Sequence, residues 1–540
     1  MNHRASTLLV LLALGAAGCA AEDPSAHPPV CTGDSGCAAG LVCSFRFCTA
    51  DEPGSLPLRG RILPPAARDL LQQQVPELAI DPLAGNTITL RRPVVLTGTV
   101  RNEGDTFASN LPGELEARTA GEIPGLDYRF TARSLDGLDA QGHGFTLRLL
   151  EGRTYKVTFR PDTPGTPPHS FILDAQDVVD GRYDITLPAR ADYVSFQRFV
   201  RLGSADPLPV PGARVVVELP DGRALPEVTT DAEKGSFDVT LPPGTDEVRV
   251  RIEAPQAGPL FPDFQSEWLE TAPEDGVTAI TIPALPPGLE EFEAALRVVA
   301  PGADGELAPV SGLSLSMFGN LEGGSLRRSA TTDADGVARF TALPGAYEVL
   351  VSVPPGLDAG ARVARLNLAA SSGSGAAPTT VALERRALLG GVVRDASHRP
   401  VQAGTVIATL RPDKRPGDTL VVSTAPFQGV IDSQGGFALE VDPGTYDVRV
   451  VPDPYTGAPT VRLAGVVVSG PTALPVDLPA PSLAHLQVVG PDGTTIPDAI
   501  VELYLGGVEG PDDASGPPPL LVKGTTGPGG TVDLLVPYAP

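Results

Sequence analysis

The sequence is poor in basic residues and in aromatic side chains. Its 540 residues include 40 Lys and Arg against 65 Asp and Glu, a net charge of −25, and aromatic residues make up 5% of the chain. Because so negative a chain repels the phosphate backbone, nucleic acid is not expected as a partner. The same charge argues against adsorption to an anionic lipid surface through a basic patch, so any membrane attachment must be covalent or hydrophobic.

The sequence also lacks the short motifs that mark common catalytic centres. It contains no G-x-S-x-G nucleophile elbow, no G-x-x-x-x-G-K phosphate loop and no H-E-x-x-H metal motif. The six histidines are spread over different segments, and His143, in the sequence GHGF, is typical of a surface turn. We therefore predict that the protein is not an enzyme and has no cofactor.

Long apolar runs are scarce, and the clearest one lies at the N-terminus. Residues 8–17 are ten apolar residues that follow Arg4, about half of the ~20 residues needed to cross a bilayer. Small residues follow this run. The pattern predicts a signal peptide over residues 1–18 rather than a transmembrane helix.

The residues Ala16-Ala17-Gly18-Cys19 resemble the lipobox of bacterial lipoproteins. The resemblance implies lipidation of Cys19, with residues 19–30 as a flexible tether. Each buried methylene contributes about 0.8 kcal/mol, so several acyl chains would hold the protein on a membrane. Ala20, where the family's sorting rules place aspartate for inner-membrane retention, implies the outer membrane or cell surface. An ordinary signal peptide with an incidental cysteine is the alternative.

Apart from Cys19, cysteine is confined to residues 31–48, at Cys31, Cys37, Cys43 and Cys48. An exported chain meets an oxidising compartment, and so short a segment cannot build a core, so we predict two disulfides. A zinc site is the competing interpretation, but the spacing lacks paired C-x2-C sequences. Three connectivities are possible. The segment resembles small disulfide knots that follow lipoprotein tethers, which implies first-to-third and second-to-fourth pairing.

Two landmarks in the rest of the chain recur with a period close to 100 residues. The first strand of each unit ends on a valine, at Val100, Val200, Val299, Val393 and Val489. A closing strand such as ITLPA or VDLPA recurs at Leu187, Ile282, Leu383 and Leu478. A unit of this length fits one self-sufficient β-sandwich domain.

Within each unit the residues alternate as in strands with one buried face. Val248, Val250 and Ile252 alternate with charged residues, and Asp-Gly and Gly-Gly pairs mark the turns. Helical periodicity is convincing only over residues 66–75. We predict an all-β chain with about five tandem β-sandwiches. The expected units are a disulfide knot (31–48), a linker with a short helix (49–84) and repeats over 85–190, 191–286, 287–384, 385–480 and 481–540.

The third and fourth repeats carry the sequences TTDADGVARFTALPGAYEVLVSVPP and SQGGFALEVDPGTYDVRVVPDP. These resemble carboxypeptidase-regulatory-like domains, relatives of transthyretin and of starch-binding-like sandwiches. The resemblance covers residues 191–480 well, 85–190 loosely and the first part of 481–540. It implies the sandwich fold, and it leaves function open because this sandwich hosts unrelated roles.

Two segments could bind a ligand. Phe261, Phe264 and Trp268 gather in a sequence with few aromatic residues and could stack on a sugar ring, although such a cluster also plugs the open end of a sandwich. Asp333 and Asp335 could offer oxygens to calcium, but an Asp-Gly hairpin explains them equally and we expect no metal.

The fifth repeat is short of strands. Gly530 corresponds to Gly436 of the fourth repeat, so ten residues follow it where about 44 would reach a closing strand. The missing strands would leave an open edge that accepts a strand from a partner or a second copy. The alternatives are a smaller domain closed in another way, or a chain that ended early.

The sequence leaves two functions from different classes. We favour a non-catalytic structural or adhesive stalk that makes protein contacts, since five sandwiches in line would extend roughly 100 Å from the lipid. The alternative is a carbohydrate-binding surface lipoprotein. The envelope protein or glycan that would be bound is not identified by the sequence.

Overall fold

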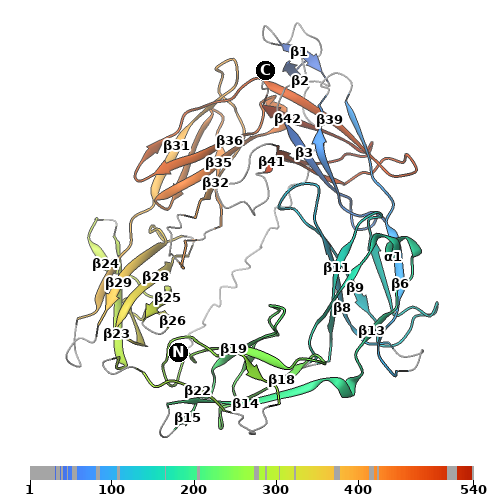
Figure 1. Cartoon of the computed structure of the whole chain (residues 1–540). Coiled ribbons are helices and arrows are strands. Elements are labelled where there is room, and N and C mark those ends of the chain that lie inside the picture. Colours follow the sequence, from blue (N-terminus) through green and yellow to red (C-terminus); the bar gives the residue numbers. More distant parts are fainter. Residues whose placement is uncertain are drawn as a thin grey trace, which may run out of the picture.

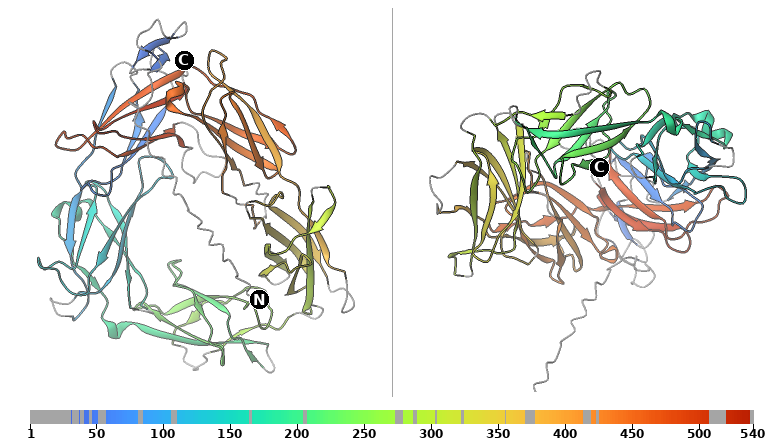
Figure 2. Two further views of the ribbon diagram at one scale, coloured as in Figure 1. Left: turned by 180° about the vertical axis from the view of Figure 1, so that it is seen from behind. Right: turned by 90° about the horizontal axis from the view of Figure 1, so that it is seen from below.

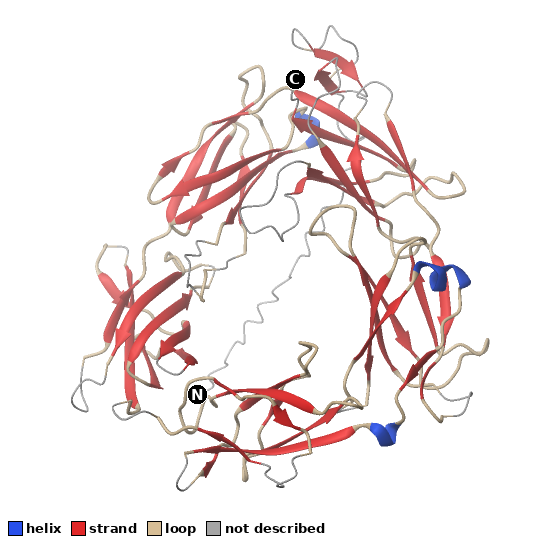
Figure 3. Cartoon of the chain, in the orientation of Figure 1, coloured by secondary structure: helices blue, strands red, loops and turns tan. Residues whose placement is uncertain are grey.

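The described part of the chain consists almost entirely of β-strands, with helix confined to short segments (Figure 3). In the computed structural model the strands form five β-sandwiches and one small two-stranded sheet. The predicted all-β tandem array is confirmed. The structure describes residues 31, 37, 41–44, 47–50, 57–80, 85–105, 110–163, 166–203, 207–272, 279–285, 289–302, 304–321, 324–354, 356–369, 377–412, 419–422, 425–506 and 520–537.

The two sequence landmarks recur together because they are paired strands. In each sandwich the first long strand runs parallel to the closing strand, and each landmark valine stands opposite a closing-strand residue. The five pairs are Val100 with Ile185, Val200 with Ile280, Val299 with Ala382, Val393 with Val476 and Val489 with Thr89.

Domain 1 has a six-stranded sheet in the order β12-β11-β8-β9-β10-β6 and a two-stranded β13-β7 sheet around its own core. Its elements are β6 (Val94–Gly98), β7 (Val100–Asn102), β8 (Gly113–Thr119), β9 (Tyr128–Ser134), β10 (Phe145–Leu149), β11 (Tyr155–Pro161), β12 (His169–Leu173), α1 (Ala175–Asp180) and β13 (Ile185–Leu187).

Domains 2 and 3 are two sandwiches whose buried side chains form one continuous core. Domain 2 contains η3 (Arg190–Asp192), β14 (Val194–Leu202), β15 (Leu208–Pro209), β16 (Arg214–Glu218), β17 (Val228–Thr229), β18 (Ser236–Leu241), β19 (Glu247–Glu253), β20 (Phe264–Gln265), β21 (Leu269–Glu270) and β22 (Ala279–Ile282). Domain 3 contains β23 (Phe292–Pro301), β24 (Leu307–Pro309), β25 (Ser314–Leu321), β26 (Gly324–Thr331), β27 (Val337–Ala342), β28 (Gly345–Ser352), β29 (Arg362–Leu368) and β30 (Thr379–Ala382).

Domain 4 has the sheets β33-β32-β35-β36 and β34-β31 with β37 and β38 beside β31. Its elements are β31 (Ala387–Arg394), β32 (Gly404–Leu410), β33 (Phe427–Ile431), β34 (Gly436–Val441), β35 (Gly444–Pro452), η4 (Pro454–Thr456), β36 (Val461–Val468), β37 (Thr472–Ala473) and β38 (Val476–Asp477).

A buried tyrosine fixes the same hairpin in three of the sandwiches. The hydroxyls of Tyr155, Tyr347 and Tyr446 donate to backbone carbonyls four or five residues earlier, at 2.9, 2.9 and 2.6 Å. Each ring is almost fully buried, so the hydrogen bond satisfies the one polar atom that the ring carries into the core. Domain 2 has Asp246 at this position and lacks the tyrosine hydrogen bond.

Domain 5 is assembled from both ends of the described chain. Its sheets are β4-β3-β40-β41 and β42-β39-β5, and they enclose one apolar core. Its strands are β3 (Leu58–Leu63), β4 (Gln73–Leu78), β5 (Asn86–Thr89), β39 (Pro481–Val489), β40 (Ile500–Leu505), β41 (Leu520–Thr525) and β42 (Thr531–Pro537).

The N-terminal strands fill the places that the fifth repeat leaves empty. In sheet order, β41-β40-β3-β4 corresponds to β33-β32-β35-β36 of domain 4, and β42-β39-β5 corresponds to β34-β31-β38. The missing counterparts of the sequences TYDVRVVP and VDLPA are therefore β3 and β5. The accepting edge exists as predicted, but it is not open, because this chain's own strands occupy it.

The predicted linker with a helix over residues 66–75 is wrong. Residues 58–63, 73–78 and 86–89 are strands, and the residues between the first two are turns or irregular. A short helix is marginal by itself. Here β40 offers β3 a full antiparallel partner, and β3 in turn pairs with β4, so tertiary pairing overrides the local pattern.

Composite domain 5 closes the array into a circuit (Figures 1 and 2). At the junction with domain 1, the backbone N–H of Gln74 donates to the Tyr128 hydroxyl at 3.0 Å, and its side-chain amide donates to Leu126. Domains 3 and 4 are joined through Glu348 of β28, whose carboxylate accepts the backbone N–H groups of Thr419 and Leu420 at 2.8 and 2.9 Å. The extended five-in-line arrangement is therefore wrong: the first described sandwich strands lie beside the last ones.

The disulfide knot rests on domain 5. Its strands β1 (Leu41–Ser44) and β2 (Phe47–Ala50) pair with each other, and β2 lies against β39. Thr49 is fully buried in this contact region. Within the described residues, no helix combines the length and the apolar character needed to span a bilayer.

We expect Ile62→Ala to unfold the C-terminal strands, which lie more than 400 residues away in sequence. Ile62 is fully buried in domain 5, and truncating a buried isoleucine costs about 2–5 kcal/mol. Hydrogen exchange should show lost protection over residues 481–537. Ile172→Ala, at a site 58% exposed in domain 1, is the control. Unchanged protection of residues 481–537 in Ile62→Ala would contradict the composite domain.

Candidate functional site

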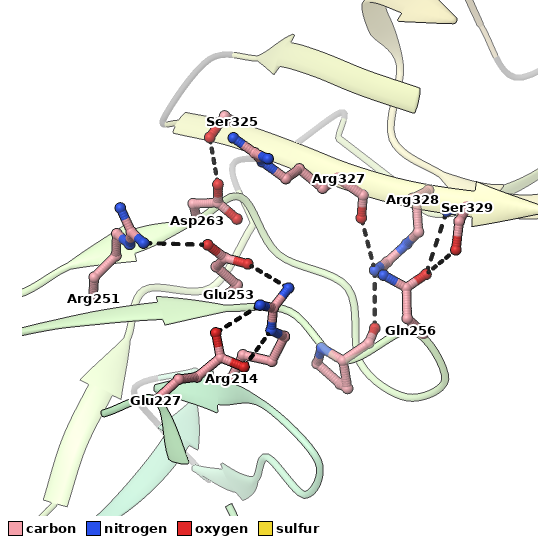
Figure 4. Close-up of polar contacts among 11 residues, drawn as sticks. Arg214, Glu227, Arg251, Glu253, Gln256, Asp263, Ser325, Arg327, Arg328 and Ser329 are labelled. Atoms are coloured by element: carbon pink, nitrogen blue, oxygen red, sulfur yellow. Dashed lines mark hydrogen bonds and ion pairs between the residues drawn. The ribbon is translucent and has the colours of Figure 1, made fainter. Parts of the chain in front are cut away.

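A cleft lies where domains 2 and 3 meet (Figure 4). It has a volume of about 540 Å³. Strands β16, β19 and β20 form one wall, and β25 and β26 form the other. Its lining includes three arginines, three carboxylates and two phenylalanines: Arg214, Arg251, Arg327, Glu227, Glu253, Asp263, Phe264 and Phe318.

The arginines of the domain 2 wall are held by carboxylates of the same wall. Arg214 donates from Nε and Nη2 to the two oxygens of Glu227 at 2.8 and 2.6 Å. It also lies 3.4 Å from Glu253, which is 3.6 Å from Arg251. The hydrogen bond to Arg214 lowers the pKa of Glu227, and the same contact raises the pKa of Arg214. This network fixes the guanidinium planes before any ligand arrives.

Asp263 links the two walls of the cleft through hydrogen bonds to Ser325. Its backbone N–H donates to the Ser325 carbonyl at 2.6 Å, and the Ser325 hydroxyl donates to its carboxylate. Burial raises the pKa of Asp263, and the negative charge of Glu253 adds to this, while the Ser325 hydrogen bond and Arg327 act against it. The charged form is thus penalised at the domain boundary.

A second set of contacts makes the junction stiff. Arg328 is 5% exposed, and its Nη1 donates to the Pro255 carbonyl at 2.9 Å. The Ser329 N–H and hydroxyl both lie 3.4 Å from the Gln256 side-chain oxygen (Figure 4). Together with the shared apolar core, these bonds hold domains 2 and 3 as one unit.

The remaining groups of the cleft are suited to binding rather than to bond cleavage. The guanidinium of Arg327 lies 5.5 Å from the centre of the Phe318 ring, a cation–π distance. The three positive and three negative side chains of the lining balance in charge. A cleft with donors, acceptors and two phenyl faces fits a polar ligand without a large net charge.

The three aromatic residues singled out in the sequence have different surroundings. Phe261 is fully buried and plugs the core shared by domains 2 and 3. Phe264 is half-buried and lines the cleft. Trp268 is 39% exposed, and the guanidinium of Arg249 lies 5.1 Å from its ring centre. They do not form one stacking platform, and Phe264 alone belongs to the cleft.

The cysteines of the knot form the disulfides Cys31–Cys43 and Cys37–Cys48, with Cα–Cα distances of 5.8 and 5.3 Å. The pairing is first to third and second to fourth. Cys31, Cys37 and Cys43 are also the one group among the described residues whose ligand atoms are close enough for a metal. All three sulfurs are already in disulfides, Cys31 with Cys43 and Cys37 with Cys48, so they are not thiolate ligands.

The remaining candidates have local explanations. Asp333 accepts the backbone N–H groups of Asp335 and Val337 at 2.9 Å each, so its carboxylate oxygen stabilises the hairpin turn. His143 lies 3.7 Å from Asp139 in such a turn. Cys19 lies outside the described residues, and its lipidation stays a prediction.

The cleft could not have been found from sequence. Arg214, Arg327 and Phe318 sit at polar or alternating positions of three strands, and nothing local distinguishes them from other strand residues. They meet only because domains 2 and 3 pack together. Phe264 was the single candidate with a sequence signal, namely its place in an aromatic-rich segment.

No family model and no curated protein matches the chain. A streptococcal ancillary pilin shares 13% identity, covering 53% of this chain and 99% of its own, with a TM-score of 0.21. The Bacillus anthracis TIE protein shares 11% identity over 82% of this chain and 72% of its own, with a TM-score of 0.18. GBS52, a minor pilin of Streptococcus agalactiae, shares 14% identity, covering 35% of this chain and 96% of its own, with a TM-score of 0.22. TM-scores this low carry no argument about function.

We expect reduction of the two disulfides to lower the melting temperature of domain 5 and to leave domains 1–4 unchanged. The knot contacts β39 of domain 5, and a disulfide typically contributes about 2–4 kcal/mol. Differential scanning calorimetry with and without reductant tests this. Cys37→Ser/Cys48→Ser, which removes one disulfide without reductant, is the matched variant. A shift of every transition would contradict it.

We expect Asp263→Asn to stabilise the unit of domains 2 and 3 at neutral pH. A carboxyl with a raised pKa favours the folded state most at low pH, and this contribution is lost as pH rises from its ordinary pKa of about 4 through the raised value. The amide keeps an acceptor for Ser325 and cannot ionise. Melting temperatures measured against pH should therefore diverge above about pH 4. Parallel curves for variant and wild type would show that Asp263 is not the titrating group.

Proposed function

We propose that this protein is a non-catalytic, exported surface lipoprotein with a structural or adhesive role, held on a membrane through lipid on Cys19. The observation that carries the proposal is composite domain 5. It places the N-terminal strands β3 and β5 beside the C-terminal strands β40 and β39. The protein is thus anchored at one point of a closed circuit of sandwiches.

In this arrangement the side of the circuit opposite domain 5 is the one presented to a binding partner. Domain 2 lies across the circuit from domain 5 (Figure 1), and it shares its core with domain 3. A contact surface built on this stiff unit loses little conformational freedom on binding. Reach from the membrane is set by the span of the circuit, and not by the summed length of five sandwiches.

The side chains support a non-catalytic role. The described histidines His143, His169, His398 and His485 belong to domains 1, 4 and 5 and do not converge. In the cleft, Arg214 pairs with both Glu227 and Glu253, and Glu253 also pairs with Arg251. Such mutually neutralised groups fix the shape of a surface, whereas a catalytic acid or base must exchange a proton with substrate.

We expect Cys19→Ser to release the protein from the envelope into the soluble fraction. The lipid is the anchor in this proposal, and a membrane-bound fraction near completeness should become a soluble one. Fractionation of cells with high-salt washes measures it, and Ser25→Ala in the same tether is the control. Retention of Cys19→Ser on membranes would contradict the lipid anchor and leave the domain architecture untouched.

Carbohydrate binding is a second candidate, favoured by the two phenyl rings in the charge-balanced cleft. Sugars present hydroxyls to charged side chains and an apolar face to aromatic rings. Phe264, rather than Trp268, would supply that face, because Trp268 already faces Arg249. Protein contacts remain the first choice, since the cleft is lined mainly by side chains that already pair with each other.

A glycan array distinguishes the two candidates. If the cleft binds sugar, Phe264→Ala should weaken binding by up to about tenfold, because a stacked ring contributes about 0.5–1.5 kcal/mol. Trp268→Ala is the matched control and should bind as wild type. Absence of glycan binding by the wild-type chain, with retention of envelope proteins on it, would reject the carbohydrate candidate.

A further inference from the structure

Domain 5 is held together across a non-covalent seam between residues 57–90 and residues 481–537. Arg61 of β3 and Glu502 of β40 form an ion pair of 3.4 Å although they are 441 residues apart. On the other sheet, Ile88 pairs with Val488. Because donor and acceptor are opposite ends of one chain, every copy carries both halves of the seam.

The seam is shaped for this donor segment. Ile62 and Leu90 are fully buried in the core that β39, β40 and β42 supply. Gly85 has a φ of +71°, and a Cβ at this position would lie 2.6 Å from the His485 ring. An unrelated strand would lack both the buried side chains and the glycine, so the acceptor selects residues 57–90.

Among the described residues, domain 5 and the knot also contain buried polar atoms that lack hydrogen-bond partners. Four buried side-chain atoms have no hydrogen-bond partner: Thr49 Oγ1, Arg61 Nε, Asn86 Nδ2 and Ser482 Oγ. All four belong to domain 5 or to the knot that rests on it, and Arg61 and Asn86 belong to the donated strands. Separating the seam returns the Arg61 and Asn86 atoms to water, which lowers the cost of opening here.

Because of the order of the chain, residues 57–90 exist for a time without the strands of residues 481–537 that they pair with. Residues 57–90 are synthesised first, and their acceptor follows only after domains 1–4. N-terminal domains generally fold before later ones appear. During this interval the donor can meet the acceptor of another copy that has not yet bound its own donor.

We propose that residues 57–90 of one copy can complete domain 5 of a second copy. The closed monomer is then the smallest member of a series of head-to-tail assemblies that all share the same seam. A heterologous contact of this kind produces closed rings or open filaments, depending on the angle between copies. The partner that fits the strand-accepting end is therefore another molecule of this protein.

Cross-linking across the seam tests the proposal. Leu63 and Ile500 are directly opposite in the β3–β40 pair, and opposite residues of antiparallel strands are within the reach of a disulfide. The full chain with Leu63→Cys and Ile500→Cys is oxidised at low and at high concentration and separated on non-reducing gels. Closed monomers give an intrachain bond, whereas exchanged copies give covalent dimers and a ladder.

We expect the interchain fraction to rise with concentration and after mild warming and cooling. The matched control is Thr405→Cys/Val430→Cys, an opposite pair within continuous domain 4, which should give only the intrachain bond. Ladders of equal strength in this control would show random cross-linking and overturn the proposal. Intrachain bonds alone in the seam variant under all conditions would also overturn it.

A second measurement does not depend on the folding of a variant. A fluorescent peptide of residues 57–90 is incubated with the wild-type full chain through the same warming cycle, and bound label is measured by gel filtration. Exchange predicts incorporation that is lost when the peptide carries Ile62→Asp and Ile88→Asp. No incorporation, or equal incorporation of the substituted peptide, means that the seam does not exchange its donor.

Discussion

The pairing of β3 with β40 and of β5 with β39 is the interaction on which the arrangement of the whole molecule depends. It supplies the fifth sandwich with a central strand and a closing strand, and it ties the two ends of the described chain together. Loop-closure entropy opposes a contact over 441 residues, but that cost grows only slowly with length. Most of the intervening chain is folded into four domains, which shortens the flexible part of the loop and reduces this entropy cost further.

Closure changes what the array can do mechanically. A linear array transmits force through one junction after another, whereas a closed circuit shares it between two routes. Two parts of the circuit differ in how well they are packed. Domains 2 and 3 share one core and are joined by buried Arg328. Domain 5 and the knot contain the buried polar atoms of the described structure that lack hydrogen-bond partners. Each such atom costs about 1–3 kcal/mol. Because strand pairing and packing alone join its two halves, the circuit can open at the seam without breaking the chain.

The cleft between domains 2 and 3 depends on that same packing. Its charges are balanced within the lining, and Asp263 holds the two walls together with a carboxyl that burial makes harder to ionise. Binding there is therefore coupled to the interdomain contact, since a ligand that hydrogen-bonds Asp263 or Ser325 competes with the bond across the boundary. Protein contact and sugar contact both remain consistent with such a surface, and they differ in whether Phe264 is used.

Alternation, turns and spacing are local properties, so the sequence alone predicts the sandwich class, the period and the missing strands of the fifth repeat. Which strands replace the missing ones depends on tertiary pairing. The tract TITL at residues 87–90 matches the closing strands, as in DITLPA at Asp184, but it lies at the start of the predicted first repeat, far from the fifth, and signals no partner. The same holds for the cleft: Arg214 and Arg327 become neighbours through domain packing, which no single strand encodes.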